Sequence, residues 1–489
     1  MVSFARRRRH FIGIATGLIT GLDFLANATV NFAESSIRGG IGVSPADFLW
    51  VLSAYAVAGA GMILLLERLG RVMSYRTLLL SGTVLFTLGS IGAMYSQSLP
   101  ALIAARLLQG LGGGPLLTCA RILLQISVPA ERRRQQLQGF MLGLFLCAAP
   151  GPWLAARLIE SGDWHALFAL HAAAGVLALI IGWAILPKRA HTTRAIGHID
   201  GWAALAFCLG VLLWMDTLQG IRYDWLNAST INRLLLALGL FAGFGWRLHR
   251  HSDPWLKLGT LASRRYLTGL GFYTLYYLIN GAVTLAVPMY LLAGEGMDLA
   301  SAGALLTVGG LCTVLMLALY FRLAAHLPDR RYVIAAGFIL LSALLLRLAA
   351  DATGATPFAT LLPIMAFKGL FPVLVVIQVA GLAFREFKQQ DFMHAYAIKN
   401  VLRLLANTLG TGIANLYWQD VAAGARNTLI ERFDPWYATF SMQGEASLAH
   451  WSQIVDQQAA LIGAMHTFTV LAALSFAGAL LVLGQKTLR

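Results

Sequence analysis

The chain has 489 residues, of which 58% are hydrophobic and only 12% charged. A soluble domain needs more polar residues than this to cover its surface, so the composition excludes a water-soluble protein and predicts a membrane protein. The formal net charge of +15 would suggest nucleic-acid binding in a soluble protein, but the distribution of the basic residues along this chain argues against a nucleic-acid partner.

Long apolar segments without a two-residue alternation predict membrane-spanning α-helices and not a β-barrel. Fourteen spans fit the sequence best, at about 11–34, 45–66, 75–96, 100–124, 137–157, 165–186, 201–219, 231–247, 266–293, 299–321, 332–350, 357–382, 393–417 and 460–484. If the arginines at positions 6–9 are cytoplasmic, 25 of the 37 lysines and arginines fall on the cytoplasmic side, which is the positive-inside distribution. The even number of spans then places both termini in the cytoplasm, with membrane lipids around the chain.

The turns between the spans indicate an internal repeat. A basic turn follows the second span, Glu67-Arg68-Leu69-Gly70-Arg71, and it has a degraded echo at residues 322–326, after the tenth span. Repeated halves with a site between them are a transporter architecture. We therefore expect a six-helix half, two inserted helices and a second six-helix half, at residues 1–190, 191–250 and 251–489. Residues 418–459 form the long predicted loop, which should lie outside the cytoplasm.

Polar residues recur along one face of the first predicted span. They are spaced by three or four residues and fall within an arc of about 80° on a helix: Thr16, Thr20, Asp23, Asn27, Asn31 and Glu34. A carboxylate at mid-membrane costs about 2.5–3.5 kcal/mol, so this face should not contact lipid. Two interpretations remain open: hydrogen bonds that join helices, or the wall of a wet cavity in which Asp23 binds an ion or a proton.

Two later spans carry similar polar faces. The ninth span has Tyr273, Tyr277, Asn280 and Thr284; aromatic rings with polar tips suit amphipathic ligands, although they are also common in packing. The thirteenth span has Tyr396, Asn400, Arg403, Asn407, Thr411 and Asn415. Arg106, Lys368 and Arg403 lie deep in spans, whereas acids at comparable depth are few. This excess of positive charge suggests an anionic cargo; alternatively, Lys368 pairs with a helix C-terminus or stays neutral.

Several short motifs together resemble one family. The segment from Arg106 to Gly112, which includes Gln109, fits the pattern R-x-x-Q-G-x-G in the fourth span. Gly151 and Pro152 fit the start of G-P-x-x-G-G in the fifth span, and residues 50–55 resemble the opening of the second. With these motifs the chain resembles, over nearly its whole length, the fourteen-span drug:proton antiporters of the major facilitator superfamily, of the EmrB type.

The resemblance implies the major facilitator fold, an all-α membrane protein of two six-helix halves plus two inserted helices, in a bacterial inner membrane. It implies proton coupling through Arg106 and, as possible partners, a periplasmic adaptor and an outer-membrane channel. It also implies gating residues, namely Glu67, Arg68, Gly70, Arg71, Gly151 and Pro152. Ala26 replaces the acid that the family has in its first span, so we expect Asp23, one turn earlier on nearly the same face, to take over that role.

These features predict a proton-driven exporter of small amphiphilic or anionic organic molecules, an antiporter that works by alternating access. Asp23 and Arg106 would couple protons, and the residues expected to contact cargo are Asn27, Asn31, Gln109, Tyr273, Tyr277, Asn280, Lys368, Arg403 and Asn407. We expect no cofactor, because the proton gradient supplies the energy, and no metal site, because the four cysteines lack metal-ligand spacing.

Two rival interpretations remain. The first is a facilitator without proton coupling. The second is a membrane-embedded enzyme or a sensor, and it is disfavoured because His394 and His466 are isolated and no two carboxylates share a helix face deep in a span.

Overall fold

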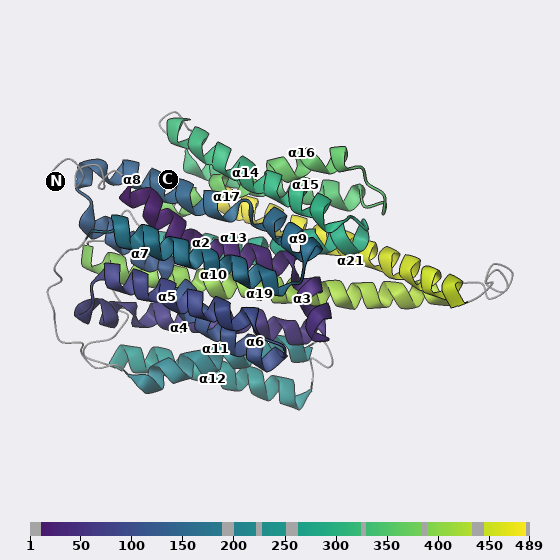
Figure 1. The fold of residues 1–489 in the computed structure, drawn as a ribbon, viewed down its shortest axis with the longest axis horizontal. Coiled ribbons are helices and arrows are strands. Elements are labelled where there is room, and N and C mark those ends of the chain that lie inside the picture. Colours follow the sequence, from purple (N-terminus) through teal and green to yellow (C-terminus); the bar gives the residue numbers. More distant parts are fainter. Residues whose placement is uncertain are drawn as a thin grey trace.

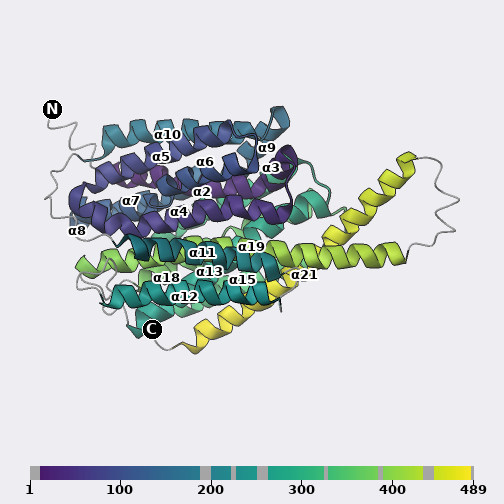
Figure 2. The same cartoon turned by 90° about the horizontal axis from the view of Figure 1, so that it is seen from below.

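The computed structural model describes residues 11–187, 200–221, 227–250, 263–323, 329–383, 389–432 and 445–485. All regular elements in these ranges are helices, which run alongside one another in a bundle (Figures 1 and 2). The first half contains α2 (Ile12–Phe32), α3 (Glu34–Ile41), α4 (Pro45–Val72), α5 (Tyr75–Met94), α6 (Leu99–Gly113), α7 (Leu116–Ser127), α8 (Ala130–Ala148), α9 (Gly151–Ser161) and α10 (His165–Ile185). The inserted pair is α11 (Gly201–Ile221) and α12 (Ala228–Arg250). The second half contains α13 (Arg264–Met289), the π-helix η2 (Tyr290–Gly294), α14 (Leu299–Leu323), α15 (Arg330–Ala350), α16 (Phe358–Lys368), α17 (Phe371–Leu374), α18 (Val376–Ala383), α19 (Gln389–Glu431) and α21 (Glu445–Gly484).

Twelve helical segments among the described residues are long and apolar enough to cross a membrane. They correspond to twelve of the predicted spans, and the seventh and thirteenth predicted spans fall on α11 and α19, so the expected count of fourteen is consistent with the structure. Large apolar side chains on the outside of the bundle, such as Trp183 (71% exposed) and Leu315 (69%), are suited to contact with lipid. The expected all-α membrane fold is confirmed.

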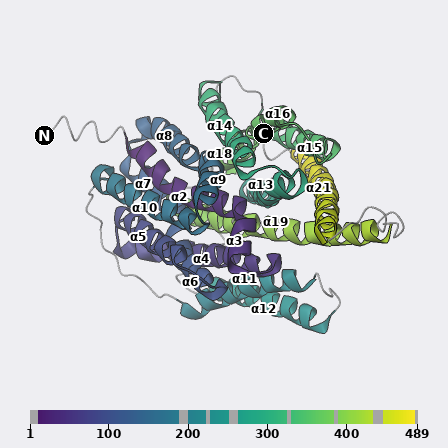
Figure 3. The ribbon, with the colours of Figure 1, turned by 45° about the vertical axis from the view of Figure 1, so that its right-hand side comes forward.

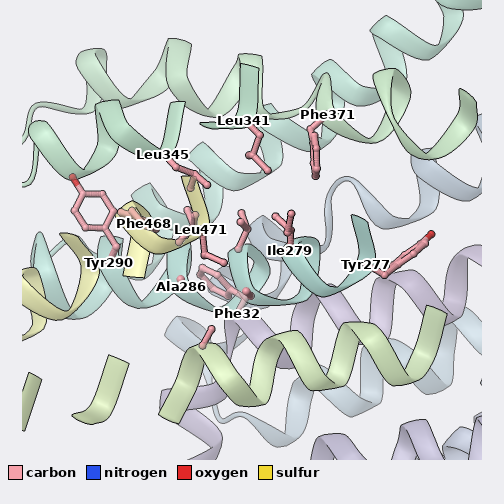
Figure 4. Packing of buried hydrophobic residues seen from close by; sticks show 14 of the residues in the cluster. Phe32, Tyr277, Ile279, Ala286, Tyr290, Leu341, Leu345, Phe371, Phe468 and Leu471 are labelled. Atoms are coloured by element: carbon pink, nitrogen blue, oxygen red, sulfur yellow. The ribbon is translucent and has the colours of Figure 1, made fainter. Parts of the chain in front are cut away.

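The helices of the two halves lie on opposite sides of the molecule, and the inserted pair lies along one edge beside α4 (Figure 3). One buried apolar cluster joins the helices of the second half to the ends of first-half helices. Figure 4 shows members of this cluster, among them Phe32 of α2 with Ile279 and Ala286 of α13. Some predicted features lie outside the described ranges or next to their ends. These are the boundaries between the halves and the inserted pair, near 190 and 250, the arginines at 6–9 and most of the repeated turn at 322–326.

The inserted helices α11 and α12 form a hairpin that is held by ion pairs. Arg233 Nη1 lies 2.6 Å from Asp216 Oδ2, and Arg247 pairs with Asp200. The hairpin packs on the first half through α11: a Cβ atom on Gly61 of α4 would lie 3.2 Å from Cys208 Sγ.

The spans of this bundle break at prolines and glycines. Pro288 interrupts the regular hydrogen bonding of α13, which is followed by the π-helical turn η2. The fifth span breaks between α8 and α9, where Gly151 follows Pro150, and the twelfth breaks after Lys368, at Gly369. All three breaks border the site described below, because Pro152, Pro288, Lys368 and Gly369 lie on its wall.

Helices α13 and α19 approach each other at two glycines. A Cβ atom on Gly281 would lie 2.0 Å from the carbonyl oxygen of Asn407, and one on Gly410 would lie 1.9 Å from that of Leu278. Both distances are far below van der Waals contact, so only glycine lets the two backbones come this close. Thr411 Oγ1 donates to the Gly281 carbonyl at 3.1 Å and adds a hydrogen bond to the same contact. These residues form the glycine seam that fixes α19 against α13.

The prediction of a loop at 418–459 is wrong for most of that segment. Helix α19 continues to Glu431, and α21 already begins at Glu445; both project beyond the other helices (Figures 1 and 2). The helix continues because residues 418–431 contain no proline and include several alanines, which favour helix. At 1.5 Å per residue, the segment 418–431 lengthens α19 by about 20 Å. Arg426 Nε lies 2.6 Å from Asp456 Oδ1 and joins the two extensions.

Candidate functional site

A cavity of about 260 Å³ lies between the two halves. Seven of the nine residues predicted to contact cargo line it: Asn27, Asn31, Tyr277, Asn280, Lys368, Arg403 and Asn407. The apolar part of the wall includes Phe24, Phe145, Phe371 and Val376. The wall therefore combines aromatic and aliphatic surface with amides and two basic side chains.

The Asp23 carboxyl is fully buried next to this wall and is held by three donors. Its Oδ2 accepts a hydrogen bond from Arg403 Nη2 at 2.7 Å, and its Oδ1 accepts from the Tyr55 hydroxyl at 2.6 Å and from Asn27 Nδ2 at 3.0 Å. Because Asp23 is on α2 and Arg403 is on α19, the ion pair joins the two halves. A buried ion pair of this kind needs such additional hydrogen bonds to offset the loss of hydration.

Both interpretations of the polar face of α2 apply, each to a different part of the helix. Thr16 and Thr20 are buried and donate at 2.8 Å to carbonyls of their own helix. Asn27 and Asn31, further along, line the cavity. The first part of α2 is therefore packed, and the later part forms the wall, with Asp23 between them.

Arg106 does not contact Asp23 directly. Its Nη1 donates to Gln109 Oε1 at 2.6 Å, and its guanidinium carbon lies 4.3 Å from the centre of the Tyr55 ring. Gln109 Nε2 in turn donates to Ser90 Oγ at 2.8 Å, and Gln109 is not part of the cavity wall. The basic partner of Asp23 is thus Arg403, and Arg106 lies behind Tyr55. The structure places Gln109 in this buried network and not among the residues that could touch cargo in this conformation.

Tyr273 also lies behind the wall. Its ring centre is 4.8 Å from that of Tyr277, which does line the cavity. Lys399 Nζ lies 4.9 Å from the centre of the Tyr273 ring. Tyr273 therefore supports Tyr277 and has no face on the cavity here.

Lys368 reaches the cavity from the break between α16 and α17. It is in the last turn of α16, where a basic side chain is favoured by the helix dipole. Gly369, the next residue, packs so closely on α14 that a Cβ would lie 2.1 Å from the Gly309 carbonyl oxygen, and its own carbonyl accepts from Thr313 Oγ1 at 2.7 Å. The backbone that carries Lys368 is therefore fixed. Its side chain is partly exposed to the cavity and pairs with no carboxylate among the described residues.

The polar face of α19 contacts both halves along its length. Asn400 Nδ2 donates to Thr118 Oγ1 of α7 at 2.7 Å, and Asn415 Nδ2 donates to the Pro45 carbonyl at 3.3 Å. Arg403 lies between these two contacts and Asn407 meets Asn280 Nδ2 at 3.4 Å. The polar face of α19 is thus occupied by contacts between helices and by the cavity.

The predicted gating turn lies at the end of α4. Glu67 Oε1 accepts from Arg71 Nε at 2.8 Å, and Arg68 Nε lies 3.5 Å from Glu67 Oε2. A Cβ on Gly70 would lie 2.6 Å from the Tyr75 hydroxyl oxygen, and that hydroxyl donates to Met393 Sδ at 3.2 Å, near the start of α19. The turn therefore lies beside a contact between the halves, and gating by it remains a prediction.

The other predicted gating motif, Gly151 and Pro152, also lies where the halves meet. A Cβ on Gly303 of α14 would lie 2.8 Å from the Pro152 carbonyl oxygen. The Trp153 amide donates to Thr307 Oγ1 at 3.1 Å, so α9 is hydrogen bonded to α14 directly after the motif. Its role in gating likewise remains a prediction.

Glu34 is a second buried carboxyl on the polar face, and it lies beyond the first span. Helix α2 ends at Phe32 and α3 begins at Glu34, so the span is slightly shorter than predicted. Neither carboxyl oxygen has a hydrogen-bond partner, and Arg38 Nε lies 3.3 Å away. Burial raises the pKa of Glu34 from its ordinary value of 4.5 to about 7, and Arg38 opposes this shift in part.

Replacing Glu34 by glutamine is expected to reduce the pH dependence of stability. Because the folded protein holds the Glu34 proton more tightly than the unfolded chain, the stability that Glu34 contributes is present below about pH 4.5 and is lost as the pH rises through about 7. The loss amounts to about 3 kcal/mol. Melting of the purified protein at pH 5 and pH 8 measures it: Glu34→Gln should melt above the wild type only at pH 8. The exposed Glu131→Gln is the matched control, and an equal pH effect in all three proteins would contradict the expectation.

Two buried side chains near the site were not assigned a role from the sequence. Tyr55 ends the motif at residues 50–55; its hydroxyl donates to Asp23 and its ring faces Arg106. His171 of α10 is fully buried, and its Nε2 lies 2.7 Å from Thr29 Oγ1 of α2. Each is a polar residue inside an otherwise apolar span, which is a weak indication of a role. Neither belongs to a row of polar residues at helical spacing, which is the pattern that identifies the polar faces of the other spans.

A family model for the Major Facilitator Superfamily matches residues 16–411 of this chain. The chain is 25% identical over 492 residues to the multidrug export protein EmrB of Haemophilus influenzae, covering 96% of this chain and 94% of that protein. It is 24% identical over 431 residues to the probable multidrug resistance protein EmrY of Escherichia coli K12, covering 87% and 83%.

Solved structures are similar over almost the whole chain. A structure from work on proton-dependent oligopeptide transporters superposes with a TM-score of 0.64 at 13% identity, covering 96% of this chain and 97% of that one. The human organic anion transporter MFSD10 gives a TM-score of 0.58 at 15% identity, covering 97% and 99%. At these identities the similarity shows the fold alone.

Proposed function

This chain belongs to the Major Facilitator Superfamily, and on that basis we propose that it is a proton-coupled exporter of small amphiphilic or anionic organic molecules. Relatives that are named multidrug export proteins support both the export and the breadth of cargo. In such a fold the two halves alternate in opening a central cavity to either side of the membrane. The observation that carries the proposal is the ion pair between Asp23 and Arg403, which joins the halves beside the cavity.

Protonation of Asp23 would change the contact between the halves. In the ionised state the carboxylate holds Arg403 through a 2.7 Å hydrogen bond inside the protein, where charges attract more strongly than in water. A proton on Asp23 removes that attraction and frees α19 from one of its contacts with α2. A proton that enters from outside and leaves to the cytoplasm would thus alternately release and restore the pair.

The cavity wall suits an amphiphilic cargo. The apolar body of such a molecule would lie against Phe24, Phe145 and Phe371. Its polar head would meet the amides of Asn27 and Asn407, while an acidic head would also be attracted by the basic side chains of the wall.

We further propose that the protein resides in a bacterial inner membrane with both termini in the cytoplasm, in agreement with the positive-inside distribution. The joined extensions of α19 and α21 would then lie on the outer side, where a periplasmic adaptor with an outer-membrane channel could bind. A photo-crosslinker at the exposed position Asn427 tests this, since a protein that exports cargo in cells without forming any crosslink there would contradict the adaptor.

Transport in everted membrane vesicles tests the proposed function. With an acidic lumen and the membrane potential clamped, we expect the cationic amphiphile trimethyl(1-naphthyl)ammonium to accumulate inside against its gradient and to be recovered chemically unchanged. A protonophore should abolish the accumulation. Equilibration at the same rate with or without the protonophore would instead indicate an uncoupled facilitator, and conversion of the probe would indicate an enzyme.

A further inference from the structure

The cavity wall carries an excess of positive charge. Lys368 and Arg403 are the charged side chains among the described residues that line it. When Asp23 is ionised it neutralises Arg403 and leaves Lys368 uncompensated. When Asp23 is protonated, both basic side chains are uncompensated, so an anion gains more by entering the cavity in that state.

Arg403 has an unused hydrogen-bond donor. Its Nη2 donates to Asp23, whereas its Nε is buried without a hydrogen-bond partner. A planar guanidinium binds a carboxylate or a similar anionic group best through two parallel N–H groups, and the pairing with Asp23 uses one. An acidic group that reaches Arg403 from the cavity therefore meets a donor set that Asp23 does not saturate.

We propose that an organic monoanion binds at Arg403 in place of the Asp23 carboxylate, and that Asp23 then takes up one proton. This inference rests on the proposed function and specifies the coupling for one class of cargo, amphiphiles with a single carboxylate or sulfonate group. Arg403 keeps its charge and exchanges one anionic partner for another. Asp23 gains its proton from water on the side to which the cavity is open, and Lys368 adds a second positive charge to the same wall.

Asp23 is the carboxyl available for this proton. The titratable and charged groups that face it or its helix from the neighbouring helices are Arg403 (α19), Tyr55 (α4), Arg106 (α6), Tyr277 (α13), Cys147 (α8) and His171 (α10). None of them is a second carboxyl. Of this set, His171 bonds Thr29 Oγ1 and not Asp23, and a variant at Asp23 shows whether the proton goes to the carboxyl.

The exchange fixes the sign of the coupling. Since binding free energies are reciprocal, the proton and the monoanion favour each other by the same factor. A monoanion would therefore cross the membrane together with a proton, so the inward proton gradient would oppose its export, which would run on the outward gradient of the monoanion itself. The inference thus narrows the proton-driven export proposed above to cationic amphiphiles. A cationic amphiphile is favoured by ionised Asp23 and disfavoured by its protonation, so it would be exchanged for the proton.

Binding of naphthalene-1-sulfonate to the purified full chain tests this inference, because a sulfonate stays ionised at every pH used. We expect its affinity to rise by up to about tenfold per unit of falling pH. Calorimetry in two buffers of different ionisation enthalpy should show uptake of up to one proton per bound sulfonate. The neutral naphthalene-1-sulfonamide has nearly the same shape and should bind without proton uptake. Sulfonate binding that is independent of pH, or that releases a proton, would overturn the proposal.

Three variants locate the exchange. Asp23→Asn should bind the sulfonate at every pH without proton uptake, because the competing carboxylate is gone. Lys368→Gln should weaken sulfonate binding and leave the proton uptake in place. In the double variant Asp23→Asn/Arg403→Gln neither partner is left as an unpaired charge, and its affinity for the sulfonate should fall to that for the sulfonamide. Tight sulfonate binding in this folded double variant would place the anion elsewhere.

Failure of the inference can be told apart from failure of the proposed function. Gradient-driven accumulation of the cationic probe in vesicles does not depend on how an anion binds. Accumulation of that probe without proton uptake on sulfonate binding would contradict the inference alone, whereas loss of accumulation in the wild type would contradict the proposed function.

Discussion

Replacing Asp23 by asparagine is expected to reduce gradient-driven accumulation of trimethyl(1-naphthyl)ammonium in everted vesicles to the level of vesicles without the protein. Asparagine has nearly the same shape and can still accept the hydrogen bond from Tyr55, but it cannot ionise, so a proton gradient no longer changes the contact with Arg403. The measurement is the initial rate of probe uptake after an acid-lumen pH gradient is imposed.

The Asp23 variant leaves Arg403 without its carboxylate, and removal of one partner of a buried ion pair costs about 3–5 kcal/mol. A second measurement therefore has to show that the variant is folded. Exchange of labelled for unlabelled probe without a pH gradient should persist in Asp23→Asn at a higher probe concentration, because the variant binds the cation more weakly but the alternation of the halves does not require ionisation of Asp23. Asp216→Asn, which removes an ion-paired acid on the inserted hairpin, should accumulate the probe normally. Normal accumulation in Asp23→Asn would show that the coupling group is elsewhere.

Replacing Gly410 by alanine is expected to destabilise the protein by about 3 kcal/mol, or to prevent folding, because the added methyl group would overlap the Leu278 carbonyl. Helices α13 and α19 must then separate along the glycine seam, which also shifts Arg403 relative to Asp23. Thermal melting of the purified protein measures the first effect, and probe uptake by whatever protein still folds measures the second.

Gly412 provides a matched control for this substitution in the same helix. A Cβ atom at Gly412 meets nothing within 4 Å, and alanine favours helix over glycine by about 1 kcal/mol. Gly412→Ala should therefore melt at or slightly above the temperature of the wild type. If Gly410→Ala and Gly412→Ala melt at the same temperature, the close approach of the two backbones is not a constraint on the fold.

Most of the fold could be predicted from the sequence, because the thickness of the bilayer dictates the length of each apolar segment. The spans agree with the helices to within a few residues at most ends, and they fail where the membrane no longer sets the length. Residues 418–431 are polar and read as a loop by hydropathy, yet they continue α19 because helix propensity alone decides their conformation outside the bilayer.

The contents of the site were predictable, whereas its pairings were not. Periodicity places Asp23, Asn27 and Asn31 on one inward face, and seven of the predicted cargo residues do line the cavity. Periodicity cannot say which basic residue meets Asp23, since Arg106 and Arg403 both lie deep in their spans. The packing of α4 determines which of the two pairs with Asp23, because Tyr55 of α4 separates Arg106 from the Asp23 carboxylate. Gln109 and Tyr273 likewise face neighbouring helices.

The unbroken length of α19 has a mechanical consequence. Arg403 and the tip at Glu431 lie on one continuous helix, about 42 Å apart at 1.5 Å per residue. If this helix pivots as a stiff rod when the buried ion pair opens, a tilt of about 5° at Arg403 sweeps the tip through roughly 4 Å. A spin label on the tip, outside the membrane, would therefore report the opening of the ion pair in the middle of the bundle.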